Sequence, residues 1–367
     1  MGWLPLSPDG IKCAKIVMLL SQEEENGKME TTIIGVDLAK NVFQVHGATE
    51  TGAVTFRKKL TRPQFRKFIS EHKPVIVAME ACGSAHYWAR EAALHGHTPK
   101  LLPSQYVKPF VKRQKNDAAD AEAIVTAAQR PGMRFVEPKT ESQQAKVTVF
   151  RARERLVHQR TQLVNALRAG LYEFGIIAPT GIYNIKRLNA FVECSECNLP
   201  DLAREEFKDI LEQIDEITKR IETKLLKLKT LAQTNDVSRR LQTMPGVGPI
   251  TAVAVEALAP DMSAFKCGRD FAAWLGLVPK QYSSGGVAKL GSVSKAGQAD
   301  IRRLLIIGAM SRISSIGRKS IPENSWLSRL LERKPKMLVA IALANKMART
   351  IWAMLTNNQD YRIPMSV

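Results

Sequence analysis

The sequence predicts an α/β domain near the N-terminus, a long helical middle with coiled-coil character, and a mainly α-helical C-terminal domain with a helix-hairpin-helix. Short β-rich runs alternate with helical stretches from Thr31 to the alanine-rich segment after Asn116. Apolar residues then recur at helical spacing, and a PGVG turn farther on joins a short helix to an apolar one. At about 100–200 residues per domain, 367 residues suffice for two or three domains. We expect a poorly ordered extension at residues 1–28, followed by domains at 29–140, 141–235 and 236–360.

The charge balance predicts an anionic partner. The chain carries 54 Lys and Arg residues against 35 Asp and Glu, a formal net charge of +19. Because 45% of the residues are hydrophobic, a disordered basic tail is excluded. Only 6% are aromatic, which favours contact with a phosphate backbone over stacking on single-stranded bases. The five cysteines suit a reducing cytoplasm, and the short apolar runs do not predict a membrane protein.

The N-terminal elements follow from local patterns. Three β-rich runs begin at Thr31, and the turn Glu50-Thr51-Gly52 between the last two predicts an antiparallel meander. Strands alternating with helices after such a meander predict a sheet with at least one parallel pair. The expected later elements are a helix at 62–71, a strand in PVIVAMEA, a helix at 84–95, a strand near 100–102 and a helix from Asn116.

Four carboxylates are placed where they can converge. Asp37 lies inside the apolar run IIGVDLA, and Glu80 ends VIVAMEA. A buried charge needs a partner, and ligands collect at the carboxyl ends of strands. In KNDAADAEAI, Asp117 and Asp120 share one helix face, with Asn116 as the expected N-cap. Each acid alone is more often a cap or a solvated end, but together the four predict an all-oxygen site for Mg²⁺ or Mn²⁺.

A basic segment leads into these acids and predicts a positive approach path for a phosphate backbone. Its members are Lys100, Lys108, Lys112, Arg113 and Lys115. The order Asp37, Glu80, Asp117-x-x-Asp120 resembles the DEDD arrangement of RuvC-like nuclease domains, which implies an RNase H-like fold. More narrowly, GVDLAKN, EACGSAHYWA and KNDAADAEAI resemble the N-terminal domain of the insertion-sequence one-ten transposases, also called bridge recombinases.

Residues 142–170 predict one long basic amphipathic helix, with six basic residues and one acidic residue. Arg153 and Arg160 fall on the seam that would otherwise be apolar, which indicates a surface facing a polyanion. A solvated charged face is the alternative.

A second long helix is predicted at 202–232, where Phe207, Ile214, Ile221 and Leu228 occupy one heptad position. Residues 201–232 hold eight acidic and seven basic side chains, and this balance predicts pairing with protein rather than nucleic acid. Glycines and prolines between the two helices indicate turns. An intramolecular hairpin and a dimerising coiled coil both remain open.

The stretch LQTMPGVGPITAVAVEAL resembles a helix-hairpin-helix. Gly246 and Gly248 would bring backbone N–H groups and a helix N-terminus close to a phosphate, without reading sequence. An ordinary glycine-rich linker is the alternative. We expect the apolar C-terminal stretch LVAIALANKMARTIWAML to form core packing.

The segment YSSGGVAKLGSVSKAG reads by composition as a flexible loop, with Lys289, Lys295, Arg302 and Arg303 as phosphate-binding charge around it. The family resemblance implies more, because a serine between AWLGLVP and SKAG forms the covalent link to DNA in those transposases. Alignment on Tyr282 assigns this role to Ser284, with Ser283 as the adjacent alternative.

The resemblance implies a transposase or site-specific recombinase acting on double-stranded DNA at the element ends and the target. Mg²⁺ or Mn²⁺ on the four carboxylates would assist Ser284, which forms a 5′-phosphoserine that a 3′-hydroxyl later displaces. A homodimer or homotetramer and a structured guide RNA are also implied. A RuvC-like Holliday-junction resolvase using water, and a nonenzymatic nucleic-acid scaffold, are the rival functions.

Overall fold

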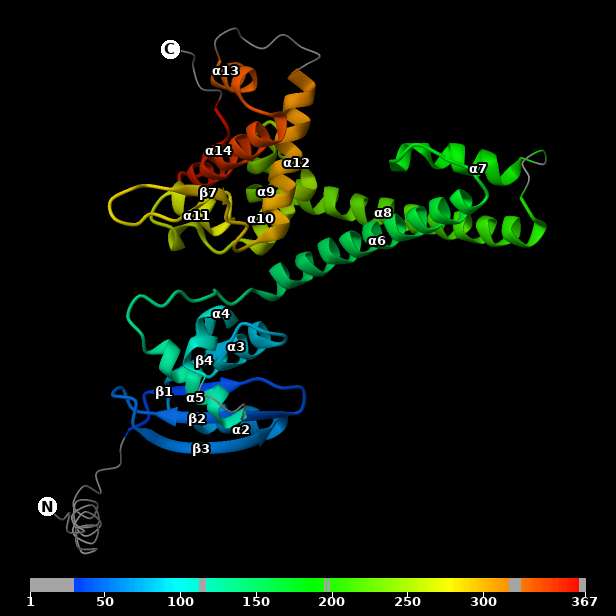
Figure 1. Cartoon of the computed structure of the whole chain (residues 1–367). Coiled ribbons are helices and arrows are strands. Elements are labelled where there is room, and N and C mark those ends of the chain that lie inside the picture. The colour runs from blue at the N-terminus through cyan, green and yellow to red at the C-terminus, as the bar shows by residue number, and fades with distance from the viewer. Residues whose placement is uncertain (1–29, 112–116, 195, 197–198, 317–324, 363–367) are drawn as a thin grey trace, which may run out of the picture. The chain divides into compact units, whose positions relative to one another are not determined.

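The computed structural model describes residues 30–111, 117–194, 196, 199–316 and 325–362, and for Asp117, Ala118 and Ile316 it describes the backbone alone (Figure 1). The chain divides into two compact units, Met1–Thr140 and Glu141–Val367. The expected extension at 1–28 lies outside the described residues. The same holds for the basic residues Lys112, Arg113 and Lys115 and for the expected N-cap Asn116.

A five-stranded mixed sheet forms the centre of the first unit. Its strand order is β3-β2-β1-β4-β5. β1 pairs antiparallel with β2 and parallel with β4, β2 pairs antiparallel with β3, and β4 pairs parallel with β5. The predicted meander and the predicted parallel pairing are therefore confirmed. The bounds are β1 Ile33–Asp37, β2 Val42–Ala48, β3 Val54–Thr61, β4 Ile76–Glu80 and β5 Thr98–Leu102.

Helices cover both faces of this sheet. One core joins Ile34 and Val36 of β1 to the side of α2 and α3, with edge-to-face rings of Phe43, Phe65 and Trp88. The opposite core joins Ile33 to α5. Adjacent residues of β1 therefore serve opposite cores, as strand alternation requires. The helices are α2 Arg62–Glu71, α3 Ala85–Leu94, α4 Ser104–Val107, the 3₁₀ turn η1 Lys108–Phe110 and α5 Asp117–Ala128.

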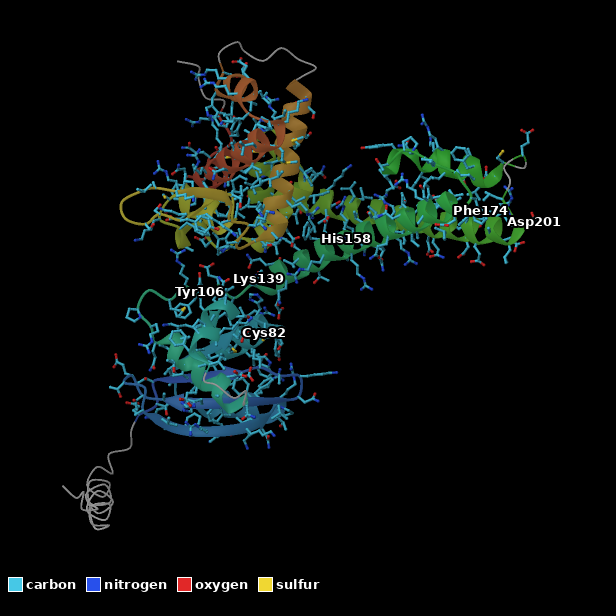
Figure 2. All side chains as sticks on the ribbon, viewed as in Figure 1. Cys82, Tyr106, Lys139, His158, Phe174 and Asp201 are labelled. Atoms are coloured by element: carbon cyan, nitrogen blue, oxygen red, sulfur yellow. The ribbon has the colours of Figure 1, made fainter. Side chains whose placement is uncertain are left out.

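Two long helices, α6 (Glu141–Glu173) and α8 (Asp201–Thr234), form an antiparallel arm in the second unit. Gly170 permits close contact, since a Cβ there would lie 2.5 Å from Cε1 of Phe207. Figure 2 shows Phe174 and Asp201 together at the far end of the arm. Of the two arrangements left open by the sequence, the chain adopts the intramolecular hairpin. The turn between the helices contains η2 Ile182–Asn184 and α7 Ile185–Glu193.

The rest of the second unit is mainly helical. Its core extends into the arm through Phe150 and Leu228. α14 is, by length and composition, the one described helix apolar enough to cross a membrane, but Val339, Met347 and Ile351 are buried in this core, as predicted. The elements are α9 Asp236–Gln242, α10 Pro249–Leu258, η3 Met262–Ala264, α11 Gly268–Trp274, β6 Pro279–Gln281, β7 Leu290–Val293, α12 Ala299–Ile316, α13 Trp326–Arg333 and α14 Lys336–Thr356.

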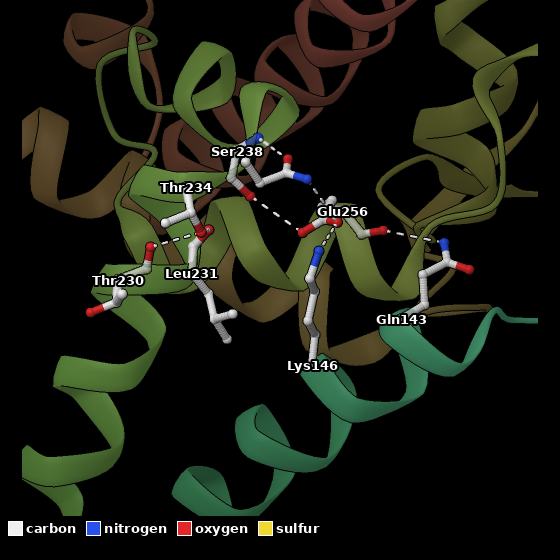
Figure 3. A network of polar contacts seen from close by, with 8 residues as sticks. Gln143, Lys146, Thr230, Leu231, Thr234, Ser238 and Glu256 are labelled. Atoms are coloured by element: carbon white, nitrogen blue, oxygen red, sulfur yellow. Dashed lines mark hydrogen bonds and ion pairs between the residues drawn. The ribbon is translucent and has the colours of Figure 1, made fainter.

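A buried ion pair fastens the start of the arm to α10 (Figure 3). Lys146 of α6 contacts Glu256 of α10, and the two side chains are only 15% and 13% exposed. Asn235 and Ser238 donate to the two Glu256 carboxylate oxygens at 3.4 and 3.5 Å. Gln143 donates to the Glu256 backbone oxygen at 3.5 Å. Three segments distant in sequence therefore meet at one carboxylate.

Replacing Glu256 by alanine is expected to destabilise the second unit by about 3 kcal/mol, because Lys146 would remain buried without its partner. The matched control is Lys219→Ala, which breaks the exposed Lys219–Asp215 pair (2.7 Å) and should cost less than about 1 kcal/mol. Urea unfolding of the full chain, followed by circular dichroism, measures both. Equal losses in the two variants would contradict a special role for the buried pair.

Candidate functional site

Asp37 and Glu80 end two neighbouring parallel strands. The register pairs Val36 with Met79, so the next position in each strand is one of these carboxylates. Val36 and Met79 are buried in the core shared with α2 and α3. Because side chains alternate along a strand, Asp37 and Glu80 belong to the opposite face, which α5 covers. Both residues are half-buried.

The direction of α5 brings its first turn to the same edge. Gly35 lets the helix approach β1, since a Cβ there would lie 2.5 Å from the Ala121 oxygen. Just beyond the C-terminal end of α5, Gln129 donates to the backbone oxygen of Thr49 at 2.9 Å. Thr49 directly follows Ala48 of β2, which pairs with Ile33 at the start of β1. The helix therefore runs antiparallel to β1. Its N-terminal turn, with Asp117 and the half-buried Asp120, lies toward the end of β1 that carries Asp37.

Two polar groups lie near this carboxylate edge, the Ser104 hydroxyl and the Cys82 thiol. The Ser104 hydroxyl at the start of α4 donates to Oε1 of Glu80. Cys82 follows Glu80 by two residues, and the pKa of its thiol is raised, first by partial burial and then by the negative charges of Glu80 and Asp37. The fields of both carboxylates therefore converge on one thiol. That thiol stays protonated near neutral pH, which makes it a poor nucleophile.

The donor set at this edge is all carboxylate oxygen, which fits a hard divalent cation rather than zinc. Within the described side chains, no group of three or more His, Cys, Asp or Glu residues is placed to hold a metal ion. Asp37, Glu80 and Asp120 therefore do not complete such a site by themselves. The Asp117 side chain is outside the described set.

The predicted serine loop connects β6 and β7, which pair antiparallel, so the segment forms a β-hairpin. Val287 N–H donates to the Ser284 oxygen at 3.1 Å, and the residues between them, Gly285 and Gly286, have φ of +56° and +79°. Two positive φ values in a two-residue loop match a type I′ turn, which strongly favours glycine. The Gly-Gly pair between two short extended runs is the sequence signal that predicts this hairpin and that composition alone missed.

The hairpin distinguishes its two serines. The Ser283 hydroxyl accepts hydrogen bonds from Gln281 Nε2 at 3.0 Å and from the Lys289 backbone N–H at 3.3 Å. Ser284 is exposed at the turn, and among the described residues its hydroxyl has no hydrogen-bond partner. Ser283 therefore holds the hairpin together, whereas Ser284 presents an accessible hydroxyl.

The four cations predicted around the hairpin differ in their surroundings. Lys289 and Lys295 are exposed and form no ion pair within the described part of the chain. Arg302 instead donates to the backbone oxygens of Leu275 and Ala296 at 2.8 and 2.7 Å, fastening SKAG to the preceding segment. Arg303 pairs with Glu154 of α6. The two lysines are therefore the least engaged of the four cations, and phosphate contact by the four stays a prediction.

The two glycines of the PGVG turn also differ. Gly246 has φ of +93°, and a Cβ there would lie 2.9 Å from the Gly308 oxygen of α12. This glycine is therefore needed for close packing of the turn on α12. Gly248 is the N-cap of α10, and a Cβ there would meet no atom within 4 Å. The open surface predicted for phosphate approach is thus at Gly248.

The seam arginines of α6 both contact other protein side chains. Arg153 forms an ion pair with Glu154 at 2.6 Å, and Arg160 donates to the Thr218 hydroxyl at 3.3 Å. Burial, and then the neighbouring charge of Arg153, lower the pKa of Arg160. Arg160 therefore makes an interhelical contact and Arg153 an ion pair within α6, while the polyanion-facing role expected for both stays a prediction.

Sequence comparisons cover most of the chain. A model described as "Transposase IS116/IS110/IS902 family" matches residues 238–323, and a DEDD transposase model of the IS110 type matches residues 34–176. A putative transposase of Sinorhizobium fredii, y4pF/y4sB, is 44% identical over 90% of this chain and 85% of its own length. A probable family 20 transposase of Pseudomonas aeruginosa is 44% identical over 91% and 99% of the two chains. The transposase for insertion sequence element IS1111A of Coxiella burnetii is 36% identical over 98% and 99%.

Proposed function

The chain belongs to the IS116/IS110/IS902 transposase family, and on that premise we propose that Ser284 is the nucleophile with which it cuts and rejoins DNA. Membership makes the chain a DNA-cleaving and recombining enzyme with DNA as its partner. The observation that carries the proposal is the exposed Ser284 hydroxyl, which has no hydrogen-bond partner among the described residues, at the tip of a hairpin whose other serine is engaged. Lys289 and Lys295 flank it with positive charge.

In the proposed reaction, the energy of the broken phosphodiester bond is kept in a phosphoserine bond. Ser284 Oγ attacks phosphorus, its proton passes to solvent, and the bond from phosphorus to the 3′-oxygen breaks as the new Oγ–P bond forms. The departing 3′-oxygen takes up a proton and leaves as a hydroxyl, while the 5′-phosphate stays on the serine. A 3′-hydroxyl of the exchanged strand reverses these steps. Rejoining therefore needs no ATP.

A DEDD transposase domain suggests a divalent metal ion. We propose that it is Mg²⁺ or Mn²⁺ and that Asp37, Glu80, Asp117 and Asp120 hold it in an RNase H-like domain. Their all-carboxylate chemistry and the common edge of β1, β4 and α5 support this set. When bound, such an ion would offset part of the negative charge of the carboxylates and would polarise the phosphate under attack. The Ser104 hydroxyl orients Glu80 through its hydrogen bond to Oε1.

The proposed carboxylates and the proposed serine belong to different units of the chain. We propose a homodimer or homotetramer in which the serine of one chain completes the carboxylate site of another, together with a structured guide RNA that selects the DNA. The family resemblance of the motifs supports both, and size measurement of the purified protein with and without its flanking transcript tests them.

The experiment that tests the function is a search for a covalent adduct. The full chain is incubated with duplex DNA of the element end, Mg²⁺ and the flanking transcript, then denatured, digested and measured by mass spectrometry. We expect a phosphodeoxynucleotide on the peptide containing Ser284. Cleaved DNA without an adduct that survives denaturation would instead favour water as the nucleophile, as in a Holliday-junction resolvase.

A further inference from the structure

The charges of α8 are segregated along its length. Residues 201–216 contain seven acidic and two basic side chains, whereas residues 217–234 contain one acidic and five basic side chains. The prediction of pairing with protein relied on the near balance of charge over the whole helix. That balance conceals two halves of opposite sign. Only the half with negative charge is unsuited to a polyanion.

The cationic half of α8 lies beside the more basic half of α6. Arg160 contacts Thr218, and Gly170 packs on Phe207, which fixes the antiparallel register. We call residues 141–160 and 217–234 the arm base. It contains ten basic and three acidic residues, and the remainder of the two helices contains three basic and eight acidic residues. The arm therefore has a positive base and a negative outer half.

A groove of about 540 Å³ opens between the two helices of the arm base. Its polar lining consists of Arg155, Gln159, Arg220, Thr223 and Lys224, and no acidic or aromatic residue lines it. Arg155 and Lys224 form no ion pair among the described residues. Arg220 pairs with Glu216 at 2.6 Å, but both side chains are more than 60% exposed, so this pair is weak.

The positive charge of the arm base is only partly neutralised inside the protein, where Arg153 pairs with Glu154 and Lys146 pairs with Glu256. Arg160 contacts Thr218 of α8, and the Nε of Arg153 is buried without a partner among the described side chains. Burial, and then the charge of the nearby Arg153, lower the pKa of Arg160, as expected for two guanidinium groups that repel each other. An anion in the groove would relieve this repulsion.

We propose that the groove of the arm base binds the phosphate backbone of double-stranded DNA. Helices rise about 1.5 Å per residue, so Arg220 and Lys224 are about 6 Å apart along α8, close to the advance of two phosphates along one strand of a duplex. The lining offers hydrogen-bond donors and no aromatic platform, which suits the backbone rather than unpaired bases. The inference relies on the DNA-recombining activity of the family and not on Ser284 as the nucleophile.

The test compares two double variants of the full chain that remove equal charge. Arg155→Gln with Lys224→Gln alters the groove, and Lys186→Gln with Lys208→Gln alters exposed lysines of α7 and the outer half of the arm. Fluorescence anisotropy with a labelled duplex of about 30 base pairs is recorded between about 50 and 200 mM salt. The groove variant should lower the slope of log affinity against log salt by about 1.8 and weaken binding by roughly 10-fold, and the control should leave both nearly unchanged.

Three results would overturn the proposal. They are an unchanged salt slope in the groove variant, an equal loss in the control, and a loss of affinity for a base-paired RNA hairpin with unchanged affinity for DNA. The last would assign the groove to RNA. Circular dichroism establishes that both variants fold. All binding is measured in the Ser284→Ala background, where no cleavage is expected, so failure of the serine mechanism leaves this result readable.

Discussion

Replacing Ser284 by alanine is expected to abolish the covalent adduct with DNA and to lower strand exchange on the order of 10⁴-fold or more. The substitution removes the attacking oxygen and nothing else that the hairpin uses, because the hydroxyl has no hydrogen-bond partner among the described residues. The type I′ turn depends on Gly285 and Gly286, which remain. DNA affinity should therefore stay within about twofold of the unaltered protein. Denaturing gels of labelled DNA measure the adduct, and anisotropy measures binding.

The neighbouring serine supplies the control. Ser283→Ala removes two hydrogen bonds, one from Gln281 on the same arm of the hairpin and one from the Lys289 backbone on the opposite arm. At about 1 kcal/mol each, their loss should slow the reaction several-fold but leave the adduct detectable. The reverse pattern, an adduct in Ser284→Ala and none in Ser283→Ala, would transfer the nucleophile to Ser283. An adduct that persists in both variants would exclude both serines as the nucleophile.

The carboxylate edge could be predicted because its signals are local. Asp37 and Glu80 each interrupt or end an apolar strand run, and parallel pairing then places the two strand ends together. The Ser104 hydroxyl on Glu80 had no such signal, because the contact depends on how the chain turns after β5. The family match adds what spacing cannot, namely that such acids belong to a transposase.

The roles of the arginines could not be predicted because their partners are distant in sequence. Arg303 pairs with Glu154, 149 residues earlier, and Arg302 fastens Ala296 to Leu275. A count of positive charge near a loop cannot separate such structural guanidinium groups from free ones. The segregated charge of α8 went unnoticed for a different reason: a total over 32 residues averages two halves of opposite sign.

Replacing Glu80 by glutamine is expected to lower DNA cleavage roughly 10³-fold while leaving DNA binding intact or slightly stronger. The amide keeps the shape of the side chain and still accepts the Ser104 hydrogen bond, so the fold should not change. What disappears is the negative charge that a divalent cation needs at the end of β4. The midpoint for activation by Mg²⁺ should therefore move to a higher concentration, which a metal titration of cleavage measures.

The control for Glu80→Gln is Glu91→Gln in the same unit, where the carboxylate of α3 pairs with Arg66 at 3.1 Å. It removes the same charge away from the β1–β4 edge and should leave cleavage within about twofold. Unchanged metal dependence in Glu80→Gln would remove Glu80 from the proposed metal set. Equal losses of cleavage in both variants would trace the effect to net charge instead. A loss of cleavage confined to Glu80→Gln, with DNA binding retained, would assign Glu80 a role in the chemistry rather than in holding DNA. The DNA-backbone contacts proposed for the arm base belong to the second unit, and this variant keeps all their cations.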